Sequence, residues 1–215
     1  MLQNRIDEIT GKLNKGVQLI AVSKTYGPEL INEAIDCGIT DIGENKVQEI
    51  LAKYDYVKPV RWHFIGHLQT NKVKQIVDKI YMIHSVDSLH LALEISKRAS
   101  KPVNVLIQVN AAGETQKYGV APKEVKALAS EIVNLPNIKL RGLMHIAPAS
   151  DNPEDVRVYF KEVKKIFDEL KLQYGEEFDT LSMGMSNDYL VAMEEGSNCV
   201  RIGTAIFGQR DYSNK

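Results

Sequence analysis

The chain has 215 residues, of which 44% are hydrophobic and 26% charged, and its formal net charge is −1. This length allows one large α/β domain or two small ones, and the near-neutral charge gives no support for a nucleic-acid or anionic-membrane surface. No apolar run approaches the roughly 20 residues of a membrane span, and residues Met1–Ile6 lack the apolar core of a signal peptide. We therefore expect a cytoplasmic protein that contacts neither nucleic acid nor membrane.

A metal site is not expected. Cys37 and Cys199 lie in no CxxC or Cys/His cluster, and the five histidines form no HExxH pattern. His63 and His67 are four residues apart, but Gly66 and the strand-like residues around His63 argue against a shared helix face. Two buried thiols in a reducing compartment are the simplest interpretation of the cysteines.

Apolar residues spaced three and four apart predict an opening helix over residues 2–13. Eight short apolar runs then alternate with longer amphipathic segments. In chain order, the predicted strands are Gln18–Val22, Ile39–Ile42, Trp62–Ile65, Tyr81–His84, Val103–Val109, Ile138–Leu143, Thr180–Ser182 and Cys199–Ile202. The intervening helices are predicted over residues 28–38, 47–54 and 73–80, after a cap at Ser88, over 122–132 and 156–170, after Ser186, and from Gly203 onward.

Eight strands, each followed by a helix or helix start, predict a (β/α)8 TIM barrel with an extra N-terminal helix, as a single domain over residues 1–215. A doubly wound open sheet is the alternative. That fold would normally carry a GxGxxG turn after the first strand, and residues 23–27 do not match it.

Barrels place their ligands at the carboxyl ends of the strands, and Lys24 ends the first strand. A lysine in a pocket there can lose its charge and attack an aldehyde, although most lysines are solvated and unreactive. After strand seven, Ser186 precedes a helix that it can cap, and after strand eight Gly203-Thr204 opens the last helix, as in the phosphate sites of many barrels. Arg201 lies in the last strand. A lysine, two loops suited to a phosphate and an arginine at one end of the barrel together suggest that the ligand is pyridoxal 5′-phosphate.

The chain also resembles the YggS/PROSC family of pyridoxal phosphate homeostasis proteins, from Leu19 to Tyr212. Six blocks carry the resemblance: Ala21–Lys24, Gly43–Glu49, Trp62–Lys72, Arg141–Met144, Met183–Asp188 and Arg201–Gly208. The resemblance implies a barrel like the N-terminal domain of alanine racemase.

By the same resemblance, Lys24 forms the Schiff base with the cofactor. It also implies that Ser186 and the Gly203-Thr204 backbone hold the phosphate, that Arg201 faces the pyridine nitrogen, and that Asn45 and Met144 line the pocket. It gives no contact for His63 or His67. Tyr26 departs from the family pattern, in which many members have a second lysine, and Lys117 is an auxiliary candidate.

Arginine cannot be deprotonated in a protein, so a ring nitrogen bonded to Arg201 would stay unprotonated and would stabilise a carbanion poorly. With eight βα units using the whole chain, we also expect no second domain to close the site. The leading hypothesis is therefore a carrier or regulator of pyridoxal phosphate, without efficient turnover, that is monomeric and transiently meets pyridoxal-phosphate-dependent apoenzymes. The alternatives are an amino-acid racemase or decarboxylase, and a cofactor-free phosphosugar-type barrel enzyme with Glu44 as base.

Overall fold

The computed structural model describes residues 1–208, in which eight parallel strands close into a barrel. Tyr212, where the family resemblance ends, lies outside the described residues. In chain order, the strands are β1 Gln18–Val22, β2 Asp41–Glu44, β3 Arg61–Phe64, β4 Met82–Val86, β5 Val103–Val109, β6 Ile138–His145, β7 Thr180–Ser182 and β8 Cys199–Ile202.

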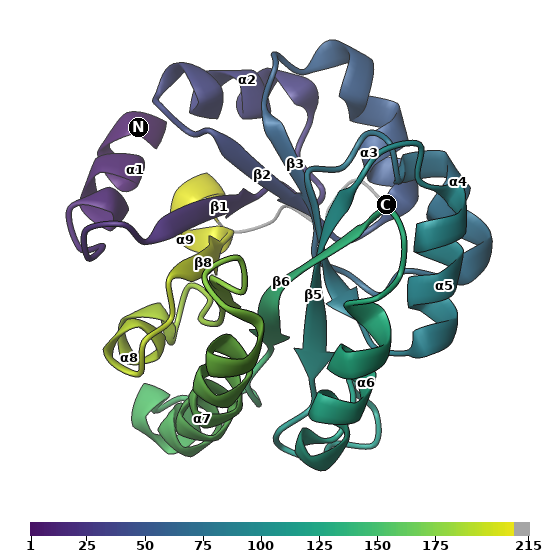
Figure 1. Ribbon diagram of the computed structural model, residues 1–215. Coiled ribbons are helices and arrows are strands. Elements are labelled where there is room, and N and C mark those ends of the chain that lie inside the picture. Colours follow the sequence, from purple (N-terminus) through teal and green to yellow (C-terminus); the bar gives the residue numbers. More distant parts are fainter. Residues whose placement is uncertain (209–215) are drawn as a thin grey trace.

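Helices surround the barrel, as Figure 1 shows. They are α1 Leu2–Thr10, α2 Pro28–Asp36, α3 Val47–Lys53, α4 Val73–Ile76, α5 Leu89–Arg98, α6 Val125–Ile132, α7 Arg157–Tyr174, α8 Tyr189–Glu194 and α9 Thr204–Phe207. Short 3-10 turns occupy Tyr54–Tyr56, Thr70–Lys72, Pro122–Glu124 and Pro153–Val156. The additional helix α1 contacts α2 and α9 at the start and end of the described chain. No helix among residues 1–208 is both long and apolar enough to cross a bilayer.

Pairing of the first strand with the last closes the sheet. Ile20 of β1 lies opposite Arg201 of β8, and Ala21 lies opposite Ile42 of β2 on the other side. The predicted (β/α)8 barrel with its extra N-terminal helix is therefore confirmed. Ser88 also has the predicted capping role, because its Oγ accepts a hydrogen bond from the amide of Leu91 at 3.3 Å.

The predicted bounds of the second strand were wrong at both ends. The second strand was expected at Ile39–Ile42 but begins at Asp41, because the amide of Ile39 still bonds the carbonyl of Ala34 in the preceding helix turn. The strand ends at Glu44, two residues beyond its predicted end, and it contains two buried acids, Asp41 and Glu44.

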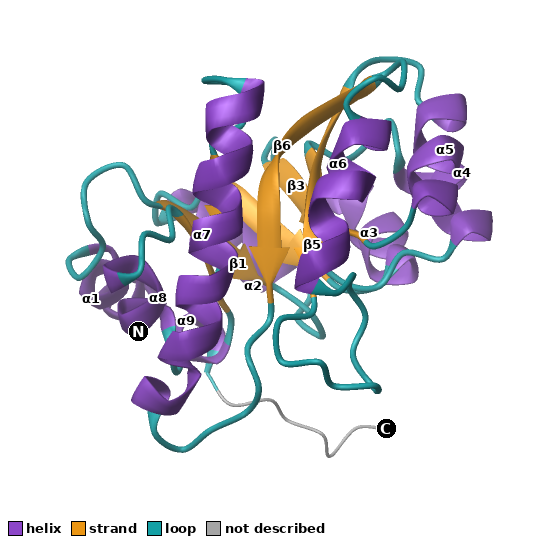
Figure 2. Cartoon of the chain, turned by 60° about the horizontal axis from the view of Figure 1, so that its bottom comes forward, coloured by secondary structure: helices purple, strands orange, loops and turns teal. Residues whose placement is uncertain are grey.

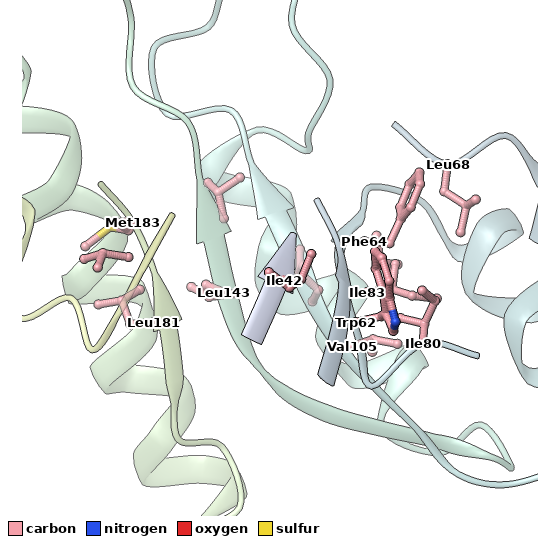
Figure 3. Packing of buried hydrophobic residues seen from close by; sticks show 14 of the residues in the cluster. Ile42, Trp62, Phe64, Leu68, Ile80, Ile83, Val105, Leu143, Leu181 and Met183 are labelled. Atoms are coloured by element: carbon pink, nitrogen blue, oxygen red, sulfur yellow. The ribbon is translucent and has the colours of Figure 1, made fainter. Parts of the chain in front are cut away.

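The main apolar core lies between the outer face of the barrel and the helices. Outward-facing side chains of β3, β4 and β5, such as Trp62, Ile83 and Val105, gather there with Leu68 and Ile80 (Figure 3). Inside the barrel, the smaller apolar cluster of Met82, Leu106 and Met144 lies beside buried polar side chains. The interior therefore carries buried polar groups such as His63, His84 and Arg201.

Candidate functional site

A cavity of about 710 Å³ opens at the carboxyl ends of the strands. In Figure 2 the loops after β5 and β6 extend beyond this end of the barrel. The cavity brings together six of the seven side chains or backbone positions that the sequence nominated: Lys24, Asn45, Ser186, Arg201, Gly203 and Thr204. Residues from 146 to 156, in the loop and turn after β6, form much of the remaining wall.

Lys24 is partly buried in this cavity, two residues beyond the end of β1. Alternate residues of a strand share one face, so Lys24 continues the inward face of Ile20 and Val22. Both neighbours of Lys24 are fixed: the Ser23 hydroxyl donates to Glu44 Oε1 at 2.7 Å, and the Thr25 amide donates to Glu49 Oε2 at 2.7 Å. Thr25 has a positive φ of 74°, a conformation that this bond helps to hold.

A buried ion pair supports the Lys24 segment from behind. Lys53 Nζ donates to Glu44 Oε1 at 2.6 Å, to Glu49 Oε2 at 2.9 Å and to the carbonyl of Ser23 at 3.1 Å. Burial raises the pKa of Glu44, while Lys53 and Ser23 oppose that rise. Glu44 is fully buried and is not among the cavity-lining residues, so the phosphosugar-type hypothesis loses the base that it required.

Asn45 lines the cavity directly after β2, and its Oδ1 is a buried atom with no hydrogen-bond partner among residues 1–208. Its backbone is covered by Gly66, where a Cβ atom would lie 2.1 Å from the Asn45 carbonyl oxygen. Only glycine allows this approach of the loop after β3 to the end of β2. Asn45 therefore brings an unpartnered buried acceptor oxygen to the cavity wall.

Arg201 is buried, yet its side chain reaches the cavity from β8. Its Nη1 donates to the Ser182 carbonyl at 2.8 Å and to the Ser182 hydroxyl at 2.6 Å, and its Nη2 donates to the His145 carbonyl at 2.8 Å. A guanidinium has five N–H groups, so donor capacity remains for an acceptor in the cavity. Burial lowers the pKa of Arg201, but an arginine stays protonated even then.

We expected Ser186 to cap the helix after β7, but it does not. That helix begins at Tyr189. Just before it, the carboxylate of Asp188 accepts a hydrogen bond from the amide of Met185 at 2.6 Å. Ser186 Oγ instead lies 3.5 Å from both Thr204 Oγ1 and the Ala205 amide, at the start of α9. The loops after β7 and β8 therefore direct two hydroxyls and a backbone amide to one place.

Met144 is the nominated residue that the structure places elsewhere. It is fully buried in the barrel interior with Met82 and Leu106, and it is not among the residues that line the cavity. The strand β6 extends to His145, two residues beyond its predicted end, so Met144 belongs to the strand rather than to its mouth. Ile146, directly after β6, packs against this cluster and lines the cavity.

The auxiliary candidates occupy the rim or lie outside it. Lys117 lines the cavity, bonding the Ala147 carbonyl at 3.2 Å and pairing with Glu114 at 2.5 Å. Tyr26 points away toward α9, where its hydroxyl bonds the carbonyl of Gly208 at 2.8 Å. His67 stacks on the ring of Tyr118 with centroids 3.6 Å apart.

The wall formed by residues 146–156 was missed at the sequence level. Its signal was present in Pro148 and Pro153, which mark a long loop between a strand and the helix α7. Loops after barrel strands build binding sites, so an irregular segment at that point in the chain could have been nominated for the cavity.

Comparisons with known proteins agree with this geometry. Residues 1–211 match the family of the alanine racemase N-terminal domain. The pyridoxal phosphate homeostasis protein of Aquifex aeolicus is 49% identical over 210 residues, which are 95% of this chain and 92% of that protein. The protein of that name from Escherichia coli K12 is 41% identical over 95% of this chain and 91% of its own length.

Solved structures give the same relationship. PipY of Synechococcus elongatus with pyridoxal phosphate bound superposes with a TM-score of 0.88 and 32% identity, over 97% of this chain and all of that chain. An alanine racemase of Clostridium difficile shares the barrel at a TM-score of 0.80 and 16% identity, and the match covers 57% of the racemase. The chain therefore belongs to the alanine racemase N-terminal domain family and, within it, to the pyridoxal phosphate homeostasis proteins.

Proposed function

We propose that this chain binds pyridoxal 5′-phosphate as a Schiff base on Lys24 and serves in pyridoxal phosphate homeostasis as a carrier or regulator without efficient turnover. The observation that carries the proposal is the meeting of Lys24, Arg201 and the Ser186–Thr204 hydroxyl pair around one cavity. PipY, whose structure contains pyridoxal phosphate, shares this barrel over its whole length.

The residues present fit the groups of this cofactor. Lys24 supplies an amine for the aldehyde, and condensation of the two releases one water molecule. Ser186, Thr204 and the Ala205 amide supply donors for a phosphate. The remaining N–H groups of Arg201 suit the pyridine nitrogen, and the unpartnered Oδ1 of Asn45 suits a hydroxyl donor.

The charge on Arg201 supports a binding function over catalysis. When bound, the cofactor supplies a reactive aldehyde and an electron sink whose strength depends on protonation of the ring nitrogen. Arg201 can only donate, so it holds that nitrogen as an acceptor and weakens the sink.

The test is trapping of the cofactor. Purified protein mixed with pyridoxal phosphate should show an imine absorbance band, and borohydride reduction followed by peptide mass spectrometry should find the cofactor on Lys24. Lys24→Ala should lose both signals. Lys123→Ala is the matched control, because Lys123 is exposed and outside the cavity. An unchanged band in Lys24→Ala, or label on another lysine, contradicts the assignment.

The same preparation separates carrier from enzyme. We expect no turnover of alanine or other small amino acids at rates typical of enzymes, which lie near 1–10³ per second. Racemisation at such rates, abolished by Lys24→Ala, would establish the racemase alternative. Mixing the loaded protein with a pyridoxal-phosphate-dependent apoenzyme should restore that enzyme's activity. We also propose that the protein is a monomer, and it should elute as one in size-exclusion chromatography.

A further inference from the structure

Five buried polar side chains form an unbroken hydrogen-bonded chain inside the barrel. Asp41 Oδ1 lies 2.7 Å from His63 Nε2, and His63 Nδ1 lies 2.9 Å from His84 Nε2. His84 Nδ1 then lies 3.1 Å from the Ser182 hydroxyl, which Arg201 Nη1 contacts at 2.6 Å. Each of the five residues is at most 3% exposed.

This row of hydrogen-bonded side chains connects the two ends of the barrel. Arg201 lines the cavity at the carboxyl ends of the strands. Asp41 lines a second cavity, of about 550 Å³, at the amino ends, where Arg61 binds its carboxylate through Nε and Nη2. The arginine of the proposed cofactor site is thus connected through side chains alone to a carboxylate at the opposite end of the fold.

The chemistry of the groups fixes the direction of every bond. Burial opposes ionisation of Asp41, but bonds from His63, Arg61 and Thr40 outweigh it and hold its pKa well below the usual range, so Asp41 is an acceptor. Burial lowers the pKa of both His63 and His84, so both rings are neutral at neutral pH and carry one N–H each.

Because Asp41 can only accept, His63 must carry its proton on Nε2 and must accept at Nδ1. His84 must then donate from Nε2 and accept at Nδ1, which leaves the Ser182 hydroxyl as the donor to that nitrogen. The oxygen of Ser182 in turn accepts from Arg201. Every bond therefore points from Arg201 toward Asp41, from a group that only donates to one that only accepts.

We propose that His63, His84 and Ser182 are positioning residues for Arg201, which hold its guanidinium toward the cofactor cavity in a single hydrogen-bonded arrangement anchored on Asp41. This inference rests on the proposed function of Arg201 but concerns residues outside the cavity.

The composition of the interior supports a role beyond filling space. The neighbouring interior cluster of Met82, Leu106 and Met144 shows that apolar side chains fit inside this barrel. Replacing a buried polar network with apolar groups of similar volume is often neutral or stabilising. A polar chain that ends on Arg201 therefore has its clearest benefit in fixing the orientation of that arginine.

One experiment needs no cofactor. Long-range ¹H–¹⁵N spectra of the wild-type protein at neutral pH should show both His63 and His84 as neutral rings protonated on Nε2. The assignments come from His63→Gln and His84→Gln, each of which should remove one ring signal. A ring protonated on Nδ1, or a doubly protonated ring, overturns the directional chain, whatever the fate of the cofactor proposal.

The second experiment uses the loaded protein. At saturating pyridoxal phosphate, His84→Leu should shift the absorbance maximum of the bound cofactor and weaken its binding. His84→Gln should return the spectrum toward wild type, because its amide can accept from Ser182 and donate to His63. Leu106→Met is the matched control, since Leu106 is fully buried inside the barrel but takes no part in the hydrogen-bonded row.

A His84→Leu protein with the wild-type spectrum and affinity overturns the positioning role. Equal spectral shifts in His84→Leu and His84→Gln also overturn the positioning role, because the loss of the buried imidazole ring, rather than of its hydrogen bonds, would then explain the effect. If His84→Leu fails to fold, the wild-type tautomers and the His84→Gln spectrum decide the question. Failure of the proposed function looks different: the wild-type protein itself would then give no cofactor band.

Discussion

The buried pair of Glu44 and Lys53 gives the sharpest stability prediction. Lys53→Met removes the cation that bonds Glu44, Glu49 and the Ser23 carbonyl, and it leaves a carboxylate that is fully shielded from water with Ser23 as its remaining donor. Breaking a buried pair by removing one partner costs about 3–5 kcal/mol. In a protein of this length, each kcal/mol lowers Tm by about 2–4 °C, so the expected loss is roughly 6–20 °C.

The pH dependence of this loss identifies its cause. Burial already raises the pKa of Glu44 and Lys53 opposes the rise, so Lys53→Met should raise that pKa further. Between the unfolded value of about 4.3 and the raised folded value, the folded state binds more protons, and stability falls as pH rises. The deficit of the variant relative to wild type should therefore be smallest in acid and should grow toward neutral pH.

Urea unfolding of wild type, Lys53→Met and Glu44→Gln/Lys53→Met at about pH 5 and about pH 8 measures both effects. The double variant removes the unpaired charge while Ser23 can still donate to the amide oxygen, so it should recover at least half of the lost stability at the higher pH. A deficit that is equal at both pH values, or a double variant no more stable than Lys53→Met, would refute the reasoning.

Two further predictions follow from burial and close approach. Gly66→Ala should lower stability by about 1–3 kcal/mol and weaken pyridoxal phosphate binding in a titration, because the new methyl would lie 2.1 Å from the Asn45 carbonyl oxygen. Gly113→Ala, whose added Cβ meets nothing within 4 Å, should leave the affinity unchanged, and equal weakening by both variants would contradict the contact argument. Burial raises the pKa of Cys199 to about 11, so a thiol reagent should label the partly exposed Cys37 in the folded protein and Cys199 only after unfolding. Rapid labelling of Cys199 in the native state would contradict its burial.

The sequence was sufficient to predict the barrel because its signals are local. Strand runs such as Val103–Val109 are mostly apolar, and α7 repeats its apolar residues at helical spacing, so each element could be recognised without knowing its neighbours. Counting strand ends then placed Lys24 and Arg201 at one edge of the sheet, and the family resemblance added Asn45. The structure finds all three around the same cavity.

Predictions failed where a residue's role depends on a partner far along the chain. Ser186 was expected to cap the next helix, but its hydroxyl lies beside Thr204 of the following βα unit. Met144 follows the pattern of a strand end, but the longer β6 keeps it in the interior. Glu44 had the position expected of a base until Lys53, nine residues later, proved to bind it.

The sequence by itself determined the order of the elements, the class of fold and the placement of Lys24 at the mouth of the first strand, because periodicity and strand ends are properties of short segments. Only the tertiary structure decided which polar groups meet inside the barrel. His63, His84 and Ser182 lie 21 and 98 residues apart along the chain, yet closure of the sheet brings them within hydrogen-bond distance. Pairing across a closed barrel is a property of the whole sheet, and no local pattern contains it.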